Sequence, residues 1–296
     1  MNQIVKIEGA VFYVDILGMS PLTNNELTLS EDDFNPWLIG YDNEHTNQIL
    51  AASILATFRS ILIDLGPEFQ NVTISQLSDC AFAWSENISD ILIFSTRFMT
   101  SAIRNGILCR SGIAFGEIIE TNQNHKLGRF IVGKAVTKAA NLEKVTKGAR
   151  IAIDPDLPSK LWNQDQTFSQ NTLPMFNPII NPLDFSELDE FKWYLCPDLE
   201  LNSPNLTTLN DVQKINLTKQ RLKIANQVMC SPKFRWNSRS SHGLVQLKAT
   251  INFISENNLF GVHHNFEWKT TDHKRSINDV EVVNQLIDRD NYSLIK

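Results

Sequence analysis

The sequence predicts an α+β fold: an antiparallel β-sheet with helices packed on it, followed by a partly helical C-terminal extension. Strand-like and helix-like segments alternate along the first half of the 296-residue chain in the order βαββαβ. Hydrophobic residues make up 42% of the sequence, which is enough to bury a core in a chain of this length.

The first strand is expected at residues 8–18, because EGAVFYVDILG is rich in β-branched and aromatic residues and ends on a glycine. A polar connection follows over residues 19–43. Apolar residues then recur at helical spacing from 49 to 65, which predicts the first helix. Residues 71–84, NVTISQLSDCAFAW, predict two strands that meet at a Ser-Asp turn.

The second part of this unit continues with further helices and strands. A helix is expected at residues 89–105, a strand at 106–119, a helix at 134–147 after a glycine-flanked loop, and a return strand at 149–153. This order is typical of a ferredoxin-like sheet with helices on one face.

The pattern weakens beyond residue 154. Residues 191–196 form the last expected strand, and a boundary near 197–205 predicts a domain over 1–200 and an extension over 201–296. Two helices are expected in the extension, at 211–229 and 243–257. No motif in the extension indicates its role.

Composition excludes several classes of protein. A net charge of −6 gives no general attraction to phosphate backbones, so nucleic acid is not an expected partner. Residues 1–6 lack the pattern of a signal peptide, and the apolar stretch 49–65 is interrupted by Arg59, which indicates a core helix rather than a membrane span. The four cysteines form no C-x-x-C pair. We therefore expect a cytoplasmic protein without a zinc site or disulfide framework.

Two aspartates are candidate metal ligands. Asp15 lies in an almost wholly apolar strand, where a carboxylate needs a cation or hydrogen-bond donors. Asp79 follows Ser78 at the predicted hairpin turn, and the first strand is expected beside both hairpin strands, so the two carboxylates can meet at one edge. Mg²⁺ and Mn²⁺ prefer such oxygen ligands. The alternative is that Asp79 stabilises a turn and Asp15 accepts backbone hydrogen bonds.

A lysine-containing helix is a candidate phosphate site. Its polar residues share one broad face at i,i+4 spacing: Lys134, Thr137, Lys138 and Asn141. Arg110 can add a fork-like phosphate contact. The alternative is an ordinary solvated helix surface.

Four segments in this order resemble the motifs of class III adenylyl and guanylyl cyclases: FYVDILGMS, LSDCAFAW, RSGIAFGE and GRFIVGKAVTKAANLE. The resemblance covers about residues 8–153. It implies a homodimer with composite active sites that converts a nucleoside triphosphate into a 3′,5′-cyclic monophosphate and pyrophosphate. It also implies that Asp15 and Asp79, assisted by the Ile16 carbonyl, bind two Mn²⁺ or Mg²⁺ ions, and that Arg110 holds the triphosphate.

The chain departs from the family at the helix that stabilises the transition state. Thr137 and Asn141 stand where the family has Asn and Arg, so Lys134, Lys138 or Arg129 is expected to replace the missing charge.

Both base-reading positions also depart. Ser75 stands where adenylyl cyclases carry a purine-reading Lys, and Phe130 stands at the second base-reading position. The loss of purine readers resembles the bacterial pyrimidine cyclases of Pycsar antiphage systems. This resemblance implies cyclic UMP, or secondly cyclic CMP, as a second messenger for a separate effector protein, with Tyr41 or Trp37 covering the base. The alternatives are an adenylate or guanylate cyclase and a catalytically silent cyclase-like sensor or dimerisation module.

Overall fold

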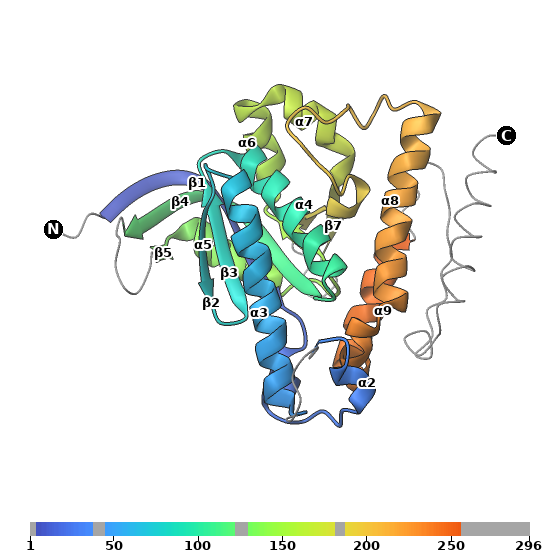
Figure 1. The fold of residues 1–296 in the computed structure, drawn as a ribbon. Coiled ribbons are helices and arrows are strands. Elements are labelled where there is room, and N and C mark those ends of the chain that lie inside the picture. Colours follow the sequence, from blue (N-terminus) through green and yellow to red (C-terminus); the bar gives the residue numbers. More distant parts are fainter. Residues whose placement is uncertain (1–3, 38–44, 122–129, 181–186, 256–296) are drawn as a thin grey trace.

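The computed structural model describes residues 4–37, 45–121, 130–180 and 187–255 (Figure 1). The strands are β1 (Ile4–Ile16), β2 (Thr73–Leu77), β3 (Cys80–Ser85), β4 (Cys109–Thr121), β5 (Ile131–Val132), β6 (Ile151–Ile153), β7 (Phe176–Ile180) and β8 (Glu187–Phe191). The α-helices are α1 (Met19–Thr23), α2 (Glu31–Phe34), α3 (Asn47–Leu65), α4 (Ile88–Arg104), α5 (Lys134–Glu143), α6 (Leu157–Gln164), α7 (Gln166–Thr172), α8 (Asp211–Cys230) and α9 (Ser241–Ser255). Four 3₁₀ helices complete the description: η1 (Gly66–Glu68), η2 (Leu173–Met175), η3 (Trp193–Leu195) and η4 (Pro232–Arg239).

The eight described strands form one sheet in the order β2-β3-β1-β4-β6-β8-β7, with β5 paired to β4. All pairings are antiparallel except that of β4 with β6. The predicted βαββαβ order is confirmed as β1, α3, β2, β3, α4 and β4. The expectation that β1 lies beside both hairpin strands is wrong for β2, because β3 and β4 occupy the two edges of β1.

Helices cover both faces of the sheet, so the expectation of helices on one face is wrong. Side chains alternate along β1: Phe12 and Val14 join the large core that includes α3 and α4, whereas Val11 joins a smaller core with α5. We call these the α4 face and the α5 face. The α5 face has an apolar lining of its own, and α5 is the helix that buries it.

Helix α5 packs closely on β4 at Gly112, which has no side chain beneath the helix. A Cβ on Gly112 would lie 2.1 Å from the carbonyl oxygen of Ala139, whereas one on Gly116 would meet Ala135 at an ordinary contact distance of 3.9 Å. Only glycine fits at position 112 without moving the helix. The C-terminal end of α5 is thereby held over the start of β4, next to Arg110.

The predicted strand at residues 191–196 is wrong, because β8 ends at Phe191 and the chain turns into η3. The turn buries Trp193, whose Nε1 donates a hydrogen bond of 2.8 Å to the carbonyl of Ala149. Burial of this indole, with a satisfied N–H, is favoured over continuation of the strand.

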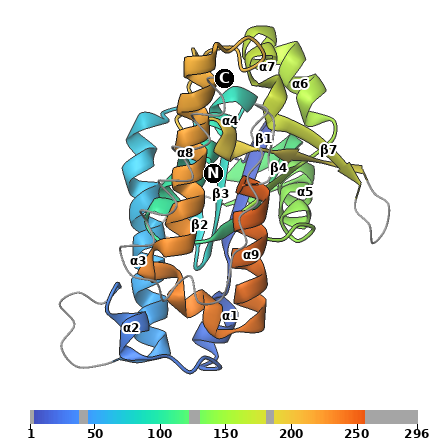
Figure 2. The same cartoon turned by 90° about the vertical axis from the view of Figure 1, so that its right-hand side faces the viewer.

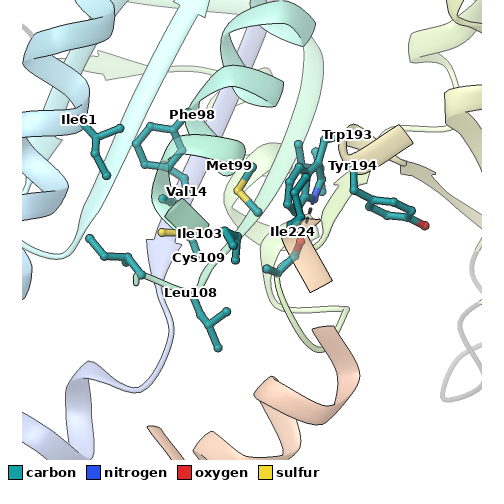
Figure 3. Close-up of a cluster of buried hydrophobic side chains, with 14 of the residues drawn as sticks. Val14, Ile61, Phe98, Met99, Ile103, Leu108, Cys109, Trp193, Tyr194 and Ile224 are labelled. Atoms are coloured by element: carbon teal, nitrogen blue, oxygen red, sulfur yellow. Dashed lines mark hydrogen bonds between the residues drawn. The ribbon is translucent and has the colours of Figure 1, made fainter. Parts of the chain in front are cut away.

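The C-terminal extension contributes to the same hydrophobic core as the sheet. Helices α8 and α9 lie side by side (Figure 2). Ile224 of α8 belongs to one buried cluster with Met99 of α4 and with Trp193 (Figure 3). The boundary at residue 200 stays a prediction, but no break in the described core separates the two parts.

One described helical segment, Asn47–Glu68, has the length and hydropathy of a candidate membrane span. Its side chains Leu50, Ile54 and Phe58 are buried in the core beneath the α4 face, as expected for a core helix.

Candidate active site

Asp15 and Asp79 meet at one end of the sheet. Asp15 is the penultimate residue of β1 and lies opposite Cys80 of β3, directly after Asp79 in the hairpin turn. The backbone N–H of Ile16 donates a hydrogen bond of 3.1 Å to the carbonyl of Asp79. Ser78 adopts the left-handed conformation (φ 57°), which makes the two-residue turn possible. The predicted meeting of the two aspartates is thus built into the backbone.

Arg110 lies on the other side of Asp15, as its register partner on β4. Its Nε and Nη2 contact Oε1 of Glu143 at 2.6 and 2.5 Å, and its Nη1 donates to the Thr146 carbonyl at 3.0 Å. Glu143 is only 3% exposed. The guanidinium predicted to hold phosphate is therefore already fixed by the end of α5.

Burial and two neighbouring carboxylates make the ionisation of Asp15 costly. The pKa of Asp15 is raised from 3.8 to about 7. Burial is the largest cause, and the nearby Glu143 and Asp79 carboxylates add to it. The Arg110 guanidinium and the Ile16 amide oppose the shift. A carboxyl group held this far above its ordinary pKa gains most from a nearby cation. The raised pKa therefore indicates a place where added positive charge is favourable.

The residues present fit a divalent cation of the Mg²⁺ or Mn²⁺ type. Such ions bind proteins through one or two carboxylates and complete their shell with water and phosphate oxygens. Asp15 and Asp79 supply the carboxylates, and Ile16 supplies the next backbone carbonyl. Among the described residues, no group of three or more His, Cys, Asp or Glu side chains is arranged as a self-sufficient metal site. The donor set thus requires oxygens from another molecule.

An aromatic surface continues from Asp15 along the α5 face. Tyr13 lies two residues before Asp15, and its ring packs on Phe82 with 4.8 Å between centroids. Phe82 in turn lies opposite Ser75 of β2. Tyr13 and Phe82 are both half-buried, because α5 packs mainly over β4, covers β1 only in part and leaves the side of the β2–β3 hairpin open. Ser75 is therefore on the same open surface as Asp15, two strands away.

The polar residues predicted on one face of α5 do not act together. Lys134, Thr137 and Asn141 are exposed on the outer side of the helix. Lys138 instead forms an ion pair with the buried Asp154 after β6. Of the two described lysines predicted to replace the missing arginine, Lys134 is exposed, whereas the 39% exposed Lys138 side chain is already paired with Asp154.

Phe130 is far from Asp15 within one chain. It is 61% exposed and pairs with Thr121, at the opposite end of β4 from Arg110. Eleven residues of strand separate the two positions, roughly 35 Å at the usual rise. Tyr41 and Arg129 lie outside the described residues. Trp37 is not available to cover a base, because it is buried and its Nε1 donates to the Lys233 carbonyl.

The sequence interpretation missed the role of Glu143 and of the Tyr13–Phe82 pair. Glu143 is the last residue of α5, the helix that carries the predicted phosphate ligands. An arginine in a buried strand needs an acidic partner, and this need was the signal in the sequence that could have identified Glu143. Tyr13 and Phe82 are separated by 69 positions, so only the register of β1 with β3 brings them together.

No protein-family model matches this sequence, and a search of curated protein sequences also found no match. Similar solved structures include the guanylyl cyclase Cya2 (11% identity, TM-score 0.45, 64% of this chain and 93% of that chain). A bacterial light-regulated adenylyl cyclase (18%, 0.42, 66% and 96%) and the adenylyl cyclase CyaB from P. aeruginosa (14%, 0.40, 64% and 95%) are also similar.

Proposed function

We propose that this chain is a nucleotide cyclase of the class III type, which converts a nucleoside triphosphate into a 3′,5′-cyclic monophosphate and pyrophosphate. The observation that carries the proposal is the convergence of Asp15, Asp79 and Arg110 at one end of the sheet. In the reaction, the ribose 3′-oxygen bonds to the α-phosphorus, the bond to the pyrophosphate oxygen breaks, and the hydroxyl proton leaves to solvent.

Asp15 and Asp79 are the proposed ligands of two Mn²⁺ or Mg²⁺ ions, with the Ile16 carbonyl. Bound there, the ions would lower the pKa of the ribose hydroxyl and neutralise charge on the departing pyrophosphate. The protein prepares the site by holding Asp15 among carboxylates that disfavour its ionisation unless a cation is present. The backbone hydrogen bond from the Ile16 N–H to the Asp79 carbonyl fixes the spacing of Asp15 and Asp79.

Arg110 is the proposed triphosphate ligand. A guanidinium has five N–H donors, and the contacts with Glu143 and Thr146 use three. Two donors stay available to phosphate oxygens while Glu143 holds the plane of the group. A fork held in advance loses less freedom on binding than a mobile one.

A homodimer completes the proposed site. The exposed side of α5 presents Lys134, Thr137 and Asn141 outward, and Tyr13 and Phe82 are only half-buried beside the part of the sheet that α5 covers. A second copy placed on the α5 face would bury this surface and bring its own α5 to the first copy's aspartates. Phe130, remote from Asp15 in its own chain, can act only across such an interface.

The proposed substrate is a pyrimidine nucleotide, UTP before CTP. Ser75 has no long cationic side chain to read a purine, and the nearby surface is aromatic and half-buried, which suits stacking of a flat base. The product, cyclic UMP or cyclic CMP, would act on a separate effector protein in antiphage defence.

A second candidate is a catalytically silent cyclase-like module. It is favoured by two ion pairs that engage the cations expected to serve phosphate: Arg110 with Glu143, and Lys138 with Asp154. In that role the chain binds a nucleotide or a second copy without turnover.

The test is incubation of the purified chain with Mn²⁺ and each of ATP, GTP, CTP and UTP separately, with products identified by mass spectrometry. Asp15→Asn is the control, because it keeps the shape of the side chain and removes the charge. Cyclic UMP or cyclic CMP from the wild type and none from the control supports the full proposal.

Other outcomes separate its parts. A cyclic purine as main product would discard the pyrimidine assignment and keep the cyclase. Nucleotide binding with no product from any triphosphate would favour the silent module.

A further inference from the structure

The C-terminal extension reaches the back of the candidate active site through η4. Gly18 follows Asp15 by three residues and has a left-handed backbone (φ 90°). A Cβ on Gly18 would lie 3.2 Å from Cζ3 of Trp236, 3.3 Å from its Cη2 and 3.4 Å from Nδ2 of Asn237. These two side chains of η4 therefore press directly on the loop that leaves β1.

A second loop at the same end of the sheet is held in the same way. Gly106 precedes β4, which carries Arg110, and a Cβ there would lie 2.3 Å from Cβ of Lys233. The two loops are themselves joined, because the Leu17 N–H donates to the Leu108 carbonyl at 2.8 Å. One 3₁₀ segment of eight residues thus packs against both strand ends of the site.

Ion pairs fix η4 to the connection between β1 and α3. Arg239 Nε lies 3.0 and 3.1 Å from the two carboxylate oxygens of Asp33, which is fully buried. Arg235 Nη1 lies 3.5 Å from Asp32. The segment is therefore anchored on α2 while it contacts Gly18 and Gly106.

The two residues that lie against Gly18, Trp236 and Asn237, are buried in a way that stability alone does not explain. Trp236 is 1% exposed and Asn237 is 2% exposed. Among the described residues, the indole Nε1 and both polar atoms of the Asn237 side chain have no hydrogen-bond partner. An apolar side chain would fill the same space without leaving buried polar groups unpaired. Their position against the loop, despite this cost, points to a role in that contact.

We propose that η4 is a positioning clamp for the metal-binding loop. Trp236 and Asn237 hold Gly18, and through it the backbone of residues 15–17, in the arrangement that sets Asp15 beside Asp79. They are positioning residues, and the metal part of this inference rests on the proposed function. The C-terminal extension is thereby assigned a role in the active site as well as in the core.

The test uses the full chain and conservative variants. Trp236→Phe removes Cζ3 and Cη2, the atoms nearest to a Cβ at position 18, and Asn237→Ala removes an amide that has no hydrogen-bond partner among the described residues. Trp193→Phe is the matched control. It makes the same substitution at another buried indole, whose N–H donates a hydrogen bond to the carbonyl of Ala149 and not to the loop after β1. Hydrogen exchange at the Ile16 and Leu17 amides reports the loop, and Mn²⁺ affinity by paramagnetic resonance reports the site.

We expect at least about tenfold faster exchange at both amides and at least about fivefold weaker Mn²⁺ binding in Trp236→Phe and Asn237→Ala. Trp193→Phe should lower the melting temperature without either effect. The reverse change is also informative: Gly18→Ala should be less harmful in the Trp236→Phe background than alone, because the shorter ring leaves room for the new Cβ.

Wild-type loop exchange and Mn²⁺ affinity in both η4 variants would overturn the clamp and leave the proposed function standing. A wild-type protein that binds no Mn²⁺ would overturn the proposed metal site. In that case the exchange data alone still decide whether η4 positions the loop.

Discussion

The two faces of the sheet differ in how completely helices cover them. On the α4 face, Phe12, Phe58 and Phe98 are fully buried and their rings meet edge to face. On the α5 face one described helix covers part of the sheet and leaves Tyr13 and Phe82 half-buried. Stability is concentrated on the first face, and the groups suited to chemistry lie on the second.

The largest expected effect on stability is from Phe98→Ala on the α4 face. Removal of this buried ring should lower the free energy of unfolding by about 3–5 kcal/mol. Phe82→Ala, the same change on the α5 face, should cost only about 1–2 kcal/mol, because the ring is already half exposed. Urea unfolding of both variants measures the difference. Equal losses would show that the two faces contribute alike.

Glu143→Gln should be the most costly change at the site itself. It leaves the largely buried Arg110 guanidinium without its counter-charge and should lower the free energy of unfolding by about 3 kcal/mol. This value is near the lower limit for broken buried ion pairs, because the Thr146 carbonyl still accepts a hydrogen bond from Arg110. The control is Glu117→Gln, which removes an exposed partner of Lys6 and should change stability by less than about 0.5 kcal/mol. Thermal unfolding compares the two. A neutral Glu143→Gln would mean that the pair does not fix Arg110.

The pKa of Asp15, raised from 3.8 to about 7, predicts a pH dependence of stability. Between these values the folded protein binds this proton more tightly than the unfolded chain, so its contribution to stability is lost as pH rises to about 7. Metal-free Asp15→Asn should therefore gain in melting temperature relative to wild type from pH 4 to pH 7, with no further gain above. Parallel curves for the two proteins would contradict the raised pKa.

The smallest expected effect is at the hairpin turn. Ser78→Gly should raise the free energy of unfolding by about 0.5–1 kcal/mol, because glycine adopts the left-handed conformation without steric cost. Ser75→Gly, in the extended strand β2, should lower it by a similar amount. Calorimetry of both variants tests the sign. A loss of stability in Ser78→Gly would show that the serine side chain itself supports the turn.

Local patterns predicted the elements well, because strand alternation and helical spacing depend on neighbouring residues. They also placed Asp15 and Asp79 together, since a strand end and a hairpin turn share one sheet edge. They failed where a distant contact decides the outcome. Glu143 pairs with Arg110, which lies 33 positions earlier in the sequence. The buried Trp37 donates a hydrogen bond to the carbonyl of Lys233 in the extension. The close packing of α5 on β4 depends on Gly112, whose missing side chain matters only once the helix lies over it.

The most direct test of the central claim is a Mn²⁺ titration of wild type, Asp15→Asn and Asp189→Asn, with free ion followed by paramagnetic resonance. Asp189 is a buried aspartate whose pKa is also raised by burial, but it lies on β8, away from the site. We predict that Asp15→Asn weakens Mn²⁺ binding at least about tenfold and that Asp189→Asn leaves it unchanged. Equal binding by all three proteins would contradict the claim that Asp15 and Asp79 form the metal site.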